Sequence, residues 1–450
     1  MTEIRYFGKQ PFSDGGEVTM IKRVTAAVGC AAFCLALLTG CSGSGGDNGG
    51  KVTLKAVTQF GGDDPAAELF STIIEEWETD TGNSVTNDSA KADNVWKSRV
   101  IADFSTGAEP DVMFFFNGSV TRPIQDKIVT VDEIRQVDPE YGSNIRDSVL
   151  NAANNLNDEG KPISLPIKGF VEAIFCNRTL FEEVGAPLPT DWESLMTAIE
   201  KFKAAGKIPI SVSLGGEPHY FFDHTILAVG GAEAMNHNPR TEEEIPASWS
   251  EGLGLIKTLY DAGAFPSDTA SMSSEDARTY FLNGEAAMYL DGSWFGVPAD
   301  DTAQAKVTQK DIQLVPFPSY TDSQNQPGTV LSGFTSGWYI SRKCWNDEKK
   351  RAAAIDFIKY NTTDEAISRY VQAAGGFAAS DGAVPDESTM SNVDRQFNQL
   401  LRDAPAAPMT AQDNLEKAAF EIYLQNATAI AIGKRTPMDV LKEMAANNQV

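Results

Sequence analysis

Basic residues, histidines and long hydrophobic runs are all scarce in this chain of 450 residues. There are 37 lysines and arginines against 62 aspartates and glutamates, which gives a formal net charge of −25. An acidic surface repels phosphate backbones and anionic lipid headgroups, so nucleic acid and membrane surfaces are poor partners and a strongly anionic ligand is disfavoured. Two of the three histidines, His219 and His224, lie close in sequence, but a metal site needs further placed ligands, and we predict none.

Several catalytic motifs are also missing after residue 40. No GxxxxGK[ST], HExxH or GxSxG sequence is present, so nucleotide-hydrolysing enzymes, zinc proteases and serine hydrolases lack their minimum parts. A glycoside hydrolase needs only two facing carboxylates, and the many acidic residues supply those by chance. That class therefore stays open as an alternative.

One short apolar run lies near the N-terminus, at residues 24 to 38, directly after Lys22 and Arg23. It is too short to span a bilayer and is typical of a signal peptide. The sequence Leu38-Thr39-Gly40-Cys41 that ends it resembles a bacterial lipobox, which implies that Cys41 is lipidated through its thiol and becomes the mature N-terminus. The alternative is an ordinary secreted protein with an incidental cysteine. Because signal peptides normally begin with their basic region, we expect translation to start at Met20, within a signal segment of residues 1–40.

Residues 41–50 contain the predicted lipidated cysteine and a glycine- and serine-rich stretch, which indicates a flexible tether. The folded part then begins near Lys51, and its roughly 400 residues exceed what one core usually supports, so we expect two lobes. Cys176 and Cys344 are the cysteines that remain in it. They could pair in an oxidising compartment, but both lie in or beside apolar runs, which favours two separate buried thiols.

Strand and helix patterns alternate from residue 51 onward. KVTLKAV reads as a strand, Asp63 or Asp64 caps a helix that ends at Gly82, and the strand DVMFFF follows a helix over 93–106. This β-α-β-α-β order predicts a parallel, doubly wound sheet. Ligands bind beyond the carboxyl ends of such strands, where Gln59 and Asp63 follow one strand and Asn117 and Ser119 follow another. For Asp63, helix capping and ligand contact are compatible roles.

Several segments resemble, in the same order, a family of extracellular solute-binding proteins. They are GAEPDVMFFFNGS (107–119), residues 160–210, FLNGEAAMYLDGSW (281–294), VPFPS (315–319) and residues 332–380. The family is family 1 of the solute-binding proteins of carbohydrate ABC transporters, the group that includes the maltose-binding protein. The resemblance covers nearly all of the chain from Lys51 onward.

This resemblance implies a two-lobe α/β fold of type II, each lobe a doubly wound, mainly parallel sheet flanked by helices, with hinge crossings between the lobes. It places 51–166 with 331–385 in one lobe and 167–330 with 386–450 in the other. It implies a lipoprotein that captures a mono- or oligosaccharide between its lobes, without a cofactor or chemistry on the sugar, and delivers it to the permease subunits of an ABC importer. The protein would be an extracytoplasmic monomer anchored to the cell membrane by its lipid. A secreted carbohydrate-active hydrolase or a surface carbohydrate adhesin is the alternative.

The site residues that the resemblance implies fall into aromatic platforms and polar edges, which suit the apolar faces and the hydroxyls of a sugar. Trp294, held out by the turn after MYLDG, resembles a stacking platform, and its alternative role is a core tryptophan. Either Tyr220 or Phe221 is the second platform. Glu172 is either a cleft carboxylate or part of a structural salt bridge. The remaining expected contacts are Glu217, Phe116, Asn117, Ser119, Gly333, Phe334 and Ser336, and where they depart from the family we expect a hydrogen-bond pattern different from that for maltose.

Overall fold

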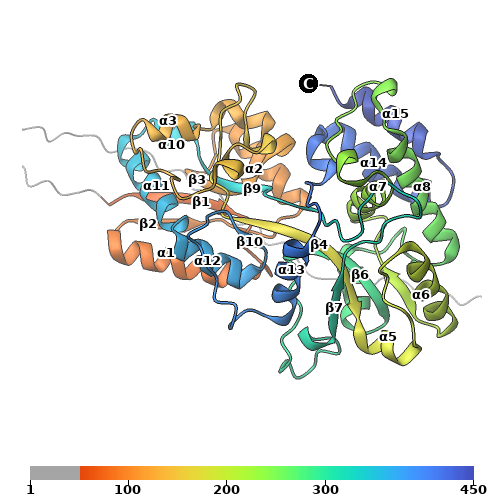
Figure 1. Cartoon of the computed structure of the whole chain (residues 1–450). Helices are drawn as coiled ribbons and strands as arrows, with labels where there is room; N and C mark the ends of the chain where they lie inside the picture. Colours follow the sequence, from red (N-terminus) through yellow and green to blue (C-terminus); the bar gives the residue numbers. More distant parts are fainter. Residues whose placement is uncertain (1–50, 450) are drawn as a thin grey trace, which may run out of the picture. The chain divides into compact units, whose positions relative to one another are not determined.

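Two β-sheets organise the computed structural model, which describes residues 51–449 (Figure 1). One sheet has the strand order β2-β1-β3-β9, and the other has the order β10-β4-β6-β5, with β7 and β8 also paired to β4. The strands are β1 Thr53–Thr58, β2 Ser84–Asn87, β3 Val112–Phe116, β4 Lys168–Asn177, β5 Ile208–Ser211, β6 Ala286–Gly292, β7 Ile312–Val315, β8 Ser332–Gly333, β9 Ser336–Ile340 and β10 Phe377–Ala378. Helices alternate with these strands, so the predicted α/β class is confirmed.

The β1 lobe, as we call the first sheet with the helices packed on it, is covered on both faces. Along β3, Val112 and Phe114 belong to one hydrophobic core, whereas Met113 and Phe115 belong to another. Side chains that alternate along a strand point to opposite faces, so the unbroken apolar run of β3 reflects burial of both faces. The helices of this lobe are α1 Ala67–Thr81, α2 Asn94–Thr106, α3 Val131–Arg135, α4 Asp147–Leu150, α10 Arg342–Trp345, α11 Glu348–Asn361 and α12 Asp364–Ala374, with 3₁₀ turns η1 Gly118–Val120, η2 Arg122–Lys127 and η3 Ala153–Asn155.

Helix α1 forms where its sequence predicts, but the predicted cap at Asp63 or Asp64 is wrong, because Ala66 precedes the helix and no side chain caps it. Its buried residues are Phe70, Ile73, Ile74 and Trp77, which recur at helical spacing and face the sheet. Gly82 ends the helix in the left-handed conformation (φ 72°), and its N–H donates to Glu78 O.

The β4 lobe, the second sheet with its helices, departs from the prediction in strand direction. The parallel pairing holds in the β1 lobe for β1 with β2 and β3, but β4 runs antiparallel to β6, β7, β8 and β10, and only β5 and β6 pair in parallel. A right-handed βαβ unit fixes neighbouring strands as parallel. Strand β4 instead enters its sheet from the β1 lobe (Figure 1), so no such crossover fixes its direction.

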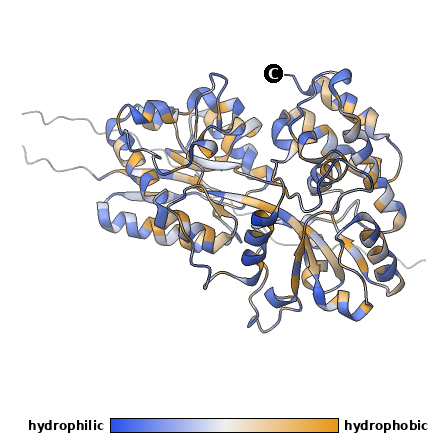
Figure 2. Ribbon diagram, in the orientation of Figure 1, coloured by the Kyte–Doolittle hydropathy of each residue, from blue (hydrophilic) through white to orange (hydrophobic). Residues whose placement is uncertain are grey.

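Both faces of the second sheet are covered as well. Along β4, Ile174 and Cys176 belong to one core and Ala173 and Phe175 to another. In Figure 2, β4 and β6 are coloured mainly hydrophobic, while the helices carry both hydrophilic and hydrophobic residues. The helices are α5 Arg178–Val184, α6 Trp192–Ala204, α7 His219–Ala234, α8 Ala247–Ala262, α9 Ser274–Leu282, α13 Asn392–Asp403, α14 Lys417–Ala431 and α15 Pro437–Asn447, with η4 Glu242–Glu244, η5 Gln309–Asp311 and η6 Ala411–Asn414.

The chain crosses between the two cores in three places. Ile167, just before β4, and Met390 are packed in the β1-lobe core, whereas Leu331, just before β8, is packed in the β4-lobe core. The crossings therefore lie near residues 167, 331 and 390. The lobe bounds given above remain a prediction.

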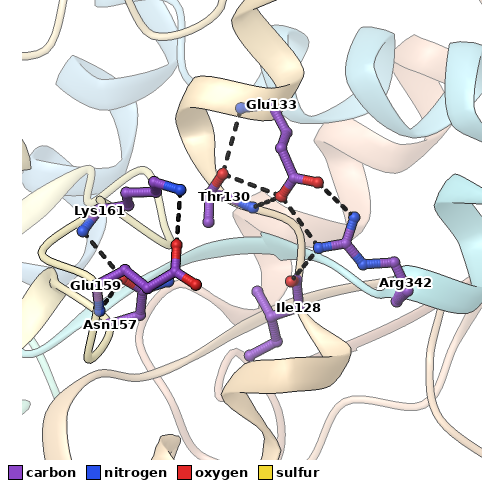
Figure 3. Close-up of polar contacts among 7 residues, drawn as sticks. All are labelled: Ile128, Thr130, Glu133, Asn157, Glu159, Lys161 and Arg342. Atoms are coloured by element: carbon purple, nitrogen blue, oxygen red, sulfur yellow. Dashed lines mark hydrogen bonds and ion pairs between the residues drawn. The ribbon is translucent and has the colours of Figure 1, made fainter.

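A polar cluster fixes the end of β9 to α3 (Figure 3). Thr130 caps α3 in a capping box with Glu133, and the Arg342 guanidinium donates to both Glu133 carboxylate oxygens (2.7 and 3.0 Å) and to Ile128 O (3.1 Å). The hydrogen bond from Arg342 lowers the pKa of Glu133 to about 2. This cluster lies at the opposite end of β9 from Ser336 and fixes the position of that strand.

The two remaining cysteines are both buried with free thiols, Cys176 on β4 and Cys344 in α10. The expectation of two separate thiols is confirmed. The signal segment, the start at Met20 and the lipidation of Cys41 lie outside the described residues. Within 51–449, no helix combines the length and apolar character that a membrane crossing requires.

Candidate ligand-binding site

The loops after β1 and before β9 bring two predicted contacts together. Ser336 Oγ donates to Gln59 Oε1 at 3.1 Å, and Asn117 N donates to Thr335 O at 2.8 Å. Gln59 is half-buried and Ser336 is buried. These contacts pair the carboxyl ends of β1 and β3 with the start of β9, as expected for a crevice at the edge of a sheet.

The Asn117 side chain has protein partners on every side. Its amide donates to Asn155 Oδ1 (3.4 Å), and its Oδ1 accepts from Ser164 Oγ (3.2 Å) and from the Tyr339 hydroxyl. The residue is buried. The Asn117 side chain is therefore bonded within the protein in this conformation, while its neighbours Phe116 and Ser119 are half-buried and more accessible.

Trp294 lies just after β6 and is 36% exposed, more than any other tryptophan among residues 51–449. Its ring packs edge to face on Phe170 (centroids 5.5 Å apart, 62°). It also lies over Gly292, where an added Cβ would sit 2.6 Å from Trp294 Cζ2. The missing side chain of Gly292 therefore lets the indole fold back over the strand end with part of its surface free.

The two aromatic residues at the start of α7, Tyr220 and Phe221, were the alternatives for a second stacking platform, and the structure distinguishes them. Phe221 is fully buried in the β4-lobe core, edge to face with Phe265 at 5.1 Å, so its expected stacking role is wrong. Tyr220 is 7% exposed and donates from its hydroxyl to Asp291 Oδ1 at 2.8 Å. Of the two alternatives, only Tyr220 stays a candidate platform.

Burial controls the charge of the acids near Tyr220. It raises the pKa of Asp291 to about 7, against the hydrogen bond from Gly292 N, which lowers it. It also raises the pKa of half-buried Glu217, which stands just before α7. Desolvation disfavours a carboxylate unless a cation or several donors compensate it. Both acids are therefore poised to gain from a ligand that donates hydrogen bonds.

Glu172 on β4 is buried (3% exposed) and lies under this surface. Its Oε2 is 3.5 Å from His224 Nδ1, but that nitrogen is 2.9 Å from Tyr220 O, and Oε2 has no hydrogen-bond partner. Burial raises the pKa of Glu172 well above its usual range and lowers that of His224 to about 4. A charged salt bridge is therefore disfavoured here, because burial favours the neutral form of both groups.

The other predicted contacts lie at the rim or in packing positions. Asp63 is exposed and pairs with Lys91 (3.2 Å), while Asp64, not Asp63, accepts from the backbone before α1 (Ala66 N, 2.8 Å). The half-buried Phe334 ring packs on Phe377 at 4.9 Å. Gly333, also half-buried, faces the Met409 side chain, where an added Cβ would lie 2.9 Å from Met409 Cγ.

Sequence reasoning missed two groups beside these residues. Lys97 on α2 holds its Nζ 3.9 Å from the Phe116 ring centroid, and burial lowers its pKa. The His219 ring lies against Tyr220 (centroids 4.1 Å, 33°), and burial lowers the His219 pKa to about 3, so this ring is a neutral aromatic surface. The only sequence signal for His219 was its place beside Tyr220, and Lys97 had none.

The β4 lobe has a small pocket among the candidate residues. A pocket beside Glu217 and Tyr220, walled also by Ser213 and Ser274, has a cavity volume of about 10 Å³. That is roughly the room for one water molecule. Within residues 51–449, no group of three or more His, Cys, Asp or Glu side chains is placed to bind a metal ion.

Comparison with known proteins gives a family and several relatives. The family model for the bacterial extracellular solute-binding proteins matches residues 61–367. The multiple sugar-binding protein of Streptococcus mutans serotype c is 25% identical over 245 residues, 53% of this chain and 56% of that protein. The match thus spans little more than half of that relative.

Solved structures are alike over more of the chain. A protein from work on xylan utilization by Caldanaerobius polysaccharolyticus has a TM-score of 0.74 at 21% identity, over 88% of this chain and 99% of its own. A chitin oligosaccharide binding protein has a TM-score of 0.72 at 22% identity, over 88% and 97%. At these identities the likeness shows the fold, which is the two-lobe periplasmic-binding-protein fold of type II.

Proposed function

Because the chain belongs to the bacterial extracellular solute-binding proteins, we propose that it captures a mono- or oligosaccharide for an ABC importer and hands it to the membrane permease. The sugar-binding relatives support this substrate class. The observation that carries it is Trp294, an indole kept partly free over Gly292 and backed by Phe170. A flat, half-free aromatic surface beside buried acids suits a ring that is apolar on its face and hydroxylated at its edge.

The contact residues of this proposal come from both lobes. Gln59, Phe116, Ser119 and Ser336 belong to the β1 lobe, and Asp63 stands at its rim. Trp294, Tyr220, Glu217 and Glu172 belong to the β4 lobe, and Gly333 and Phe334 lie on the crossing between the lobes. The Asn117 side chain is bonded within the protein.

Closure of the lobes is the mechanism that we propose. In the described conformation the lobes already touch, since Arg122 of η2 forms an ion pair with Glu416, which follows η6. The pocket beside Tyr220 is lined by residues of the β4 lobe alone and holds about 10 Å³, far less than a sugar ring needs, so we place the ligand between the lobes, where it enters when they open. A ligand that contacts both lobes only when they are shut then shifts the population toward the closed state.

The anchor and the assembly state belong to the same proposal. We expect a monomer that is tethered outside the cytoplasm by lipid on Cys41 and that starts at Met20. Labelling the protein with a clickable palmitate analogue, in wild type and in Cys41→Ser, tests the anchor. Label in both proteins, or in neither, would contradict it.

Calorimetric titration with a panel of neutral sugars tests the proposed function. Xylotriose, chitobiose, maltotriose, raffinose and galactose are suitable probes, and tryptophan emission and sugar composition are followed in the same samples. Binding with a shifted emission and unchanged sugar is the expected result. Turnover of the sugar would establish the hydrolase alternative, and the absence of binding to every sugar would reject the proposal.

A further inference from the structure

Lys97 occupies a position that the stability of the fold does not explain. It lies in the first turn of α2, where the helix dipole opposes a cation. The side chain is half-buried with its Nζ 3.9 Å from the Phe116 ring centroid. Among residues 51–449 its ammonium has no hydrogen-bond acceptor and no carboxylate oxygen within 4.0 Å. Because the protein supplies no acceptor, the ammonium is left to bond with water or with a ligand.

The two acids with the largest charge effect on Lys97 belong to the other lobe. Asp413 of η6 and Glu217 before α7 both raise the pKa of Lys97, against the larger lowering effect of burial. Lys97 in turn lowers the pKa of both carboxyls, each of which is raised overall by burial. Gly118, two residues after Phe116, lies close to Asp413, because an added Cβ there would sit 3.5 Å from Asp413 O. The ammonium and the two carboxyls therefore act on each other from opposite lobes without a direct contact.

A ligand hydroxyl suits a position between an ammonium and two carboxyls better than a charged ligand group does. It accepts a hydrogen bond from an ammonium and donates its own proton to a carboxylate, and the two bonds together span roughly 5 to 6 Å. A ligand carboxylate would meet two acids, and a ligand ammonium would meet Lys97. The arrangement thus favours an uncharged, hydroxylated ligand.

We propose that Lys97 is a specificity-determining contact, whose ammonium donates to a hydroxyl of a neutral saccharide while that hydroxyl donates to Glu217 or Asp413. This inference rests on the proposed function and narrows its substrate class to uncharged sugars. It adds a contact from α2, in which the sequence indicated none. Phe116 then acts as the support that holds the ammonium in place.

The test combines Lys97→Met with a matched control, Lys257→Met, which removes an exposed lysine of α8 paired with Asp261 (2.6 Å). The panel sugar that binds wild type most tightly is titrated into each protein, together with its monodeoxy derivatives. Lys97→Met should bind it about ten- to a hundredfold more weakly, the loss expected for a hydrogen bond to a charged group. Lys257→Met should bind as wild type does. Lys97→Gln serves the same comparison if the methionine variant does not fold.

The deoxy sugars distinguish a direct hydrogen bond from Lys97 to the sugar from an indirect effect of Lys97 on the structure of the site. One deoxy position should weaken wild type about tenfold or more and Lys97→Met by a clearly smaller factor, because only the bond to Glu217 or Asp413 is left to lose. Glucuronic and galacturonic acids should bind wild type more weakly than glucose and galactose do. Equal affinity of Lys97→Met and wild type, additive deoxy losses, or tighter uronate binding would overturn the assignment alone. Failure of wild type to bind any neutral sugar would overturn the proposed function as well.

Discussion

Gly292→Ala tests whether the position of the Trp294 ring matters for ligand binding. A Cβ at Gly292 would lie 2.6 Å from Trp294 Cζ2 and still closer to Cη2 and Cζ3. Carbon atoms in contact keep about 3.5 Å, so the indole has to retreat by roughly 1 Å. Gly292 does not require glycine for its backbone conformation, because it is not among the glycines with positive φ. The substitution therefore acts mainly on the ring.

The effects on stability and on binding should separate. Replacing glycine within a strand gains about 0.5 to 1 kcal/mol of backbone entropy. Disturbing the contact of Trp294 with Phe170 loses a similar amount, about 0.5 to 1.5 kcal/mol. The net change in the free energy of unfolding is then close to zero. Loss of stacking on a sugar costs about 1 to 3 kcal/mol by analogy with bases on aromatics, which weakens binding roughly 5- to 150-fold.

Calorimetric titration with the tightest neutral sugar, and thermal unfolding without sugar, measure the two quantities. Gly254→Ala is the matched control, since Gly254 lies in α8 and a Cβ there meets nothing within 4 Å. It should leave the affinity unchanged. Wild-type affinity in Gly292→Ala, with tryptophan emission altered to show that the ring had moved, would refute the stacking role of Trp294.

Three further outcomes are expected. Trp294→Ala should weaken sugar binding by about 1 to 3 kcal/mol, measured by calorimetry, with little change in Tm because the ring is partly exposed. Burial raises the folded pKa of Asp291 from 3.8 to about 7, so its stabilising contribution is full below about pH 4 and is lost as the pH rises through 7. Asp291→Asn should therefore gain stability relative to wild type between pH 4 and pH 8, on the order of 4 kcal/mol at most, and parallel Tm curves would contradict this. Arg122→Ala and Glu416→Ala should each weaken sugar binding by at most about 1 kcal/mol, less at high salt, and the charge-exchanged double variant should recover it, because this pair of partly exposed residues joins the lobes only when they touch.

Periodicity within single elements was the reliable part of the sequence. The stripe of Phe70, Ile73 and Trp77 gave α1 its buried face, and Gly82 gave its end, because both depend on local geometry. The run in β3 likewise indicated a strand covered on both faces. The antiparallel direction of β4 was missed, because a crossing strand leaves no signature in its own residues.

Two aromatic predictions show where local reasoning ended. Trp294 was expected to stand free after a turn, and it is the most exposed tryptophan of the described chain. Tyr220 and Phe221 could not be told apart, because successive residues of a helix point about 100° from each other. Both belong to the β4-lobe core, and which of them is the more deeply buried depends on where α7 begins, which is at His219.

Lys97 illustrates a different limit. Its own surroundings in sequence, a capped helix start with Trp96 turned into the core, suggest an ordinary solvated lysine. The proposed role of Lys97 in ligand binding depends on Glu217 and Asp413, which are far away in the sequence and belong to the other lobe. A cleft between two lobes brings together charged residues that are distant in the sequence. The sequence around each of them contains only one member of the pair. Residues that select the ligand together with a residue of the other lobe therefore cannot be found from local sequence. A platform such as Trp294 can be found, because the turn beside it sets its position.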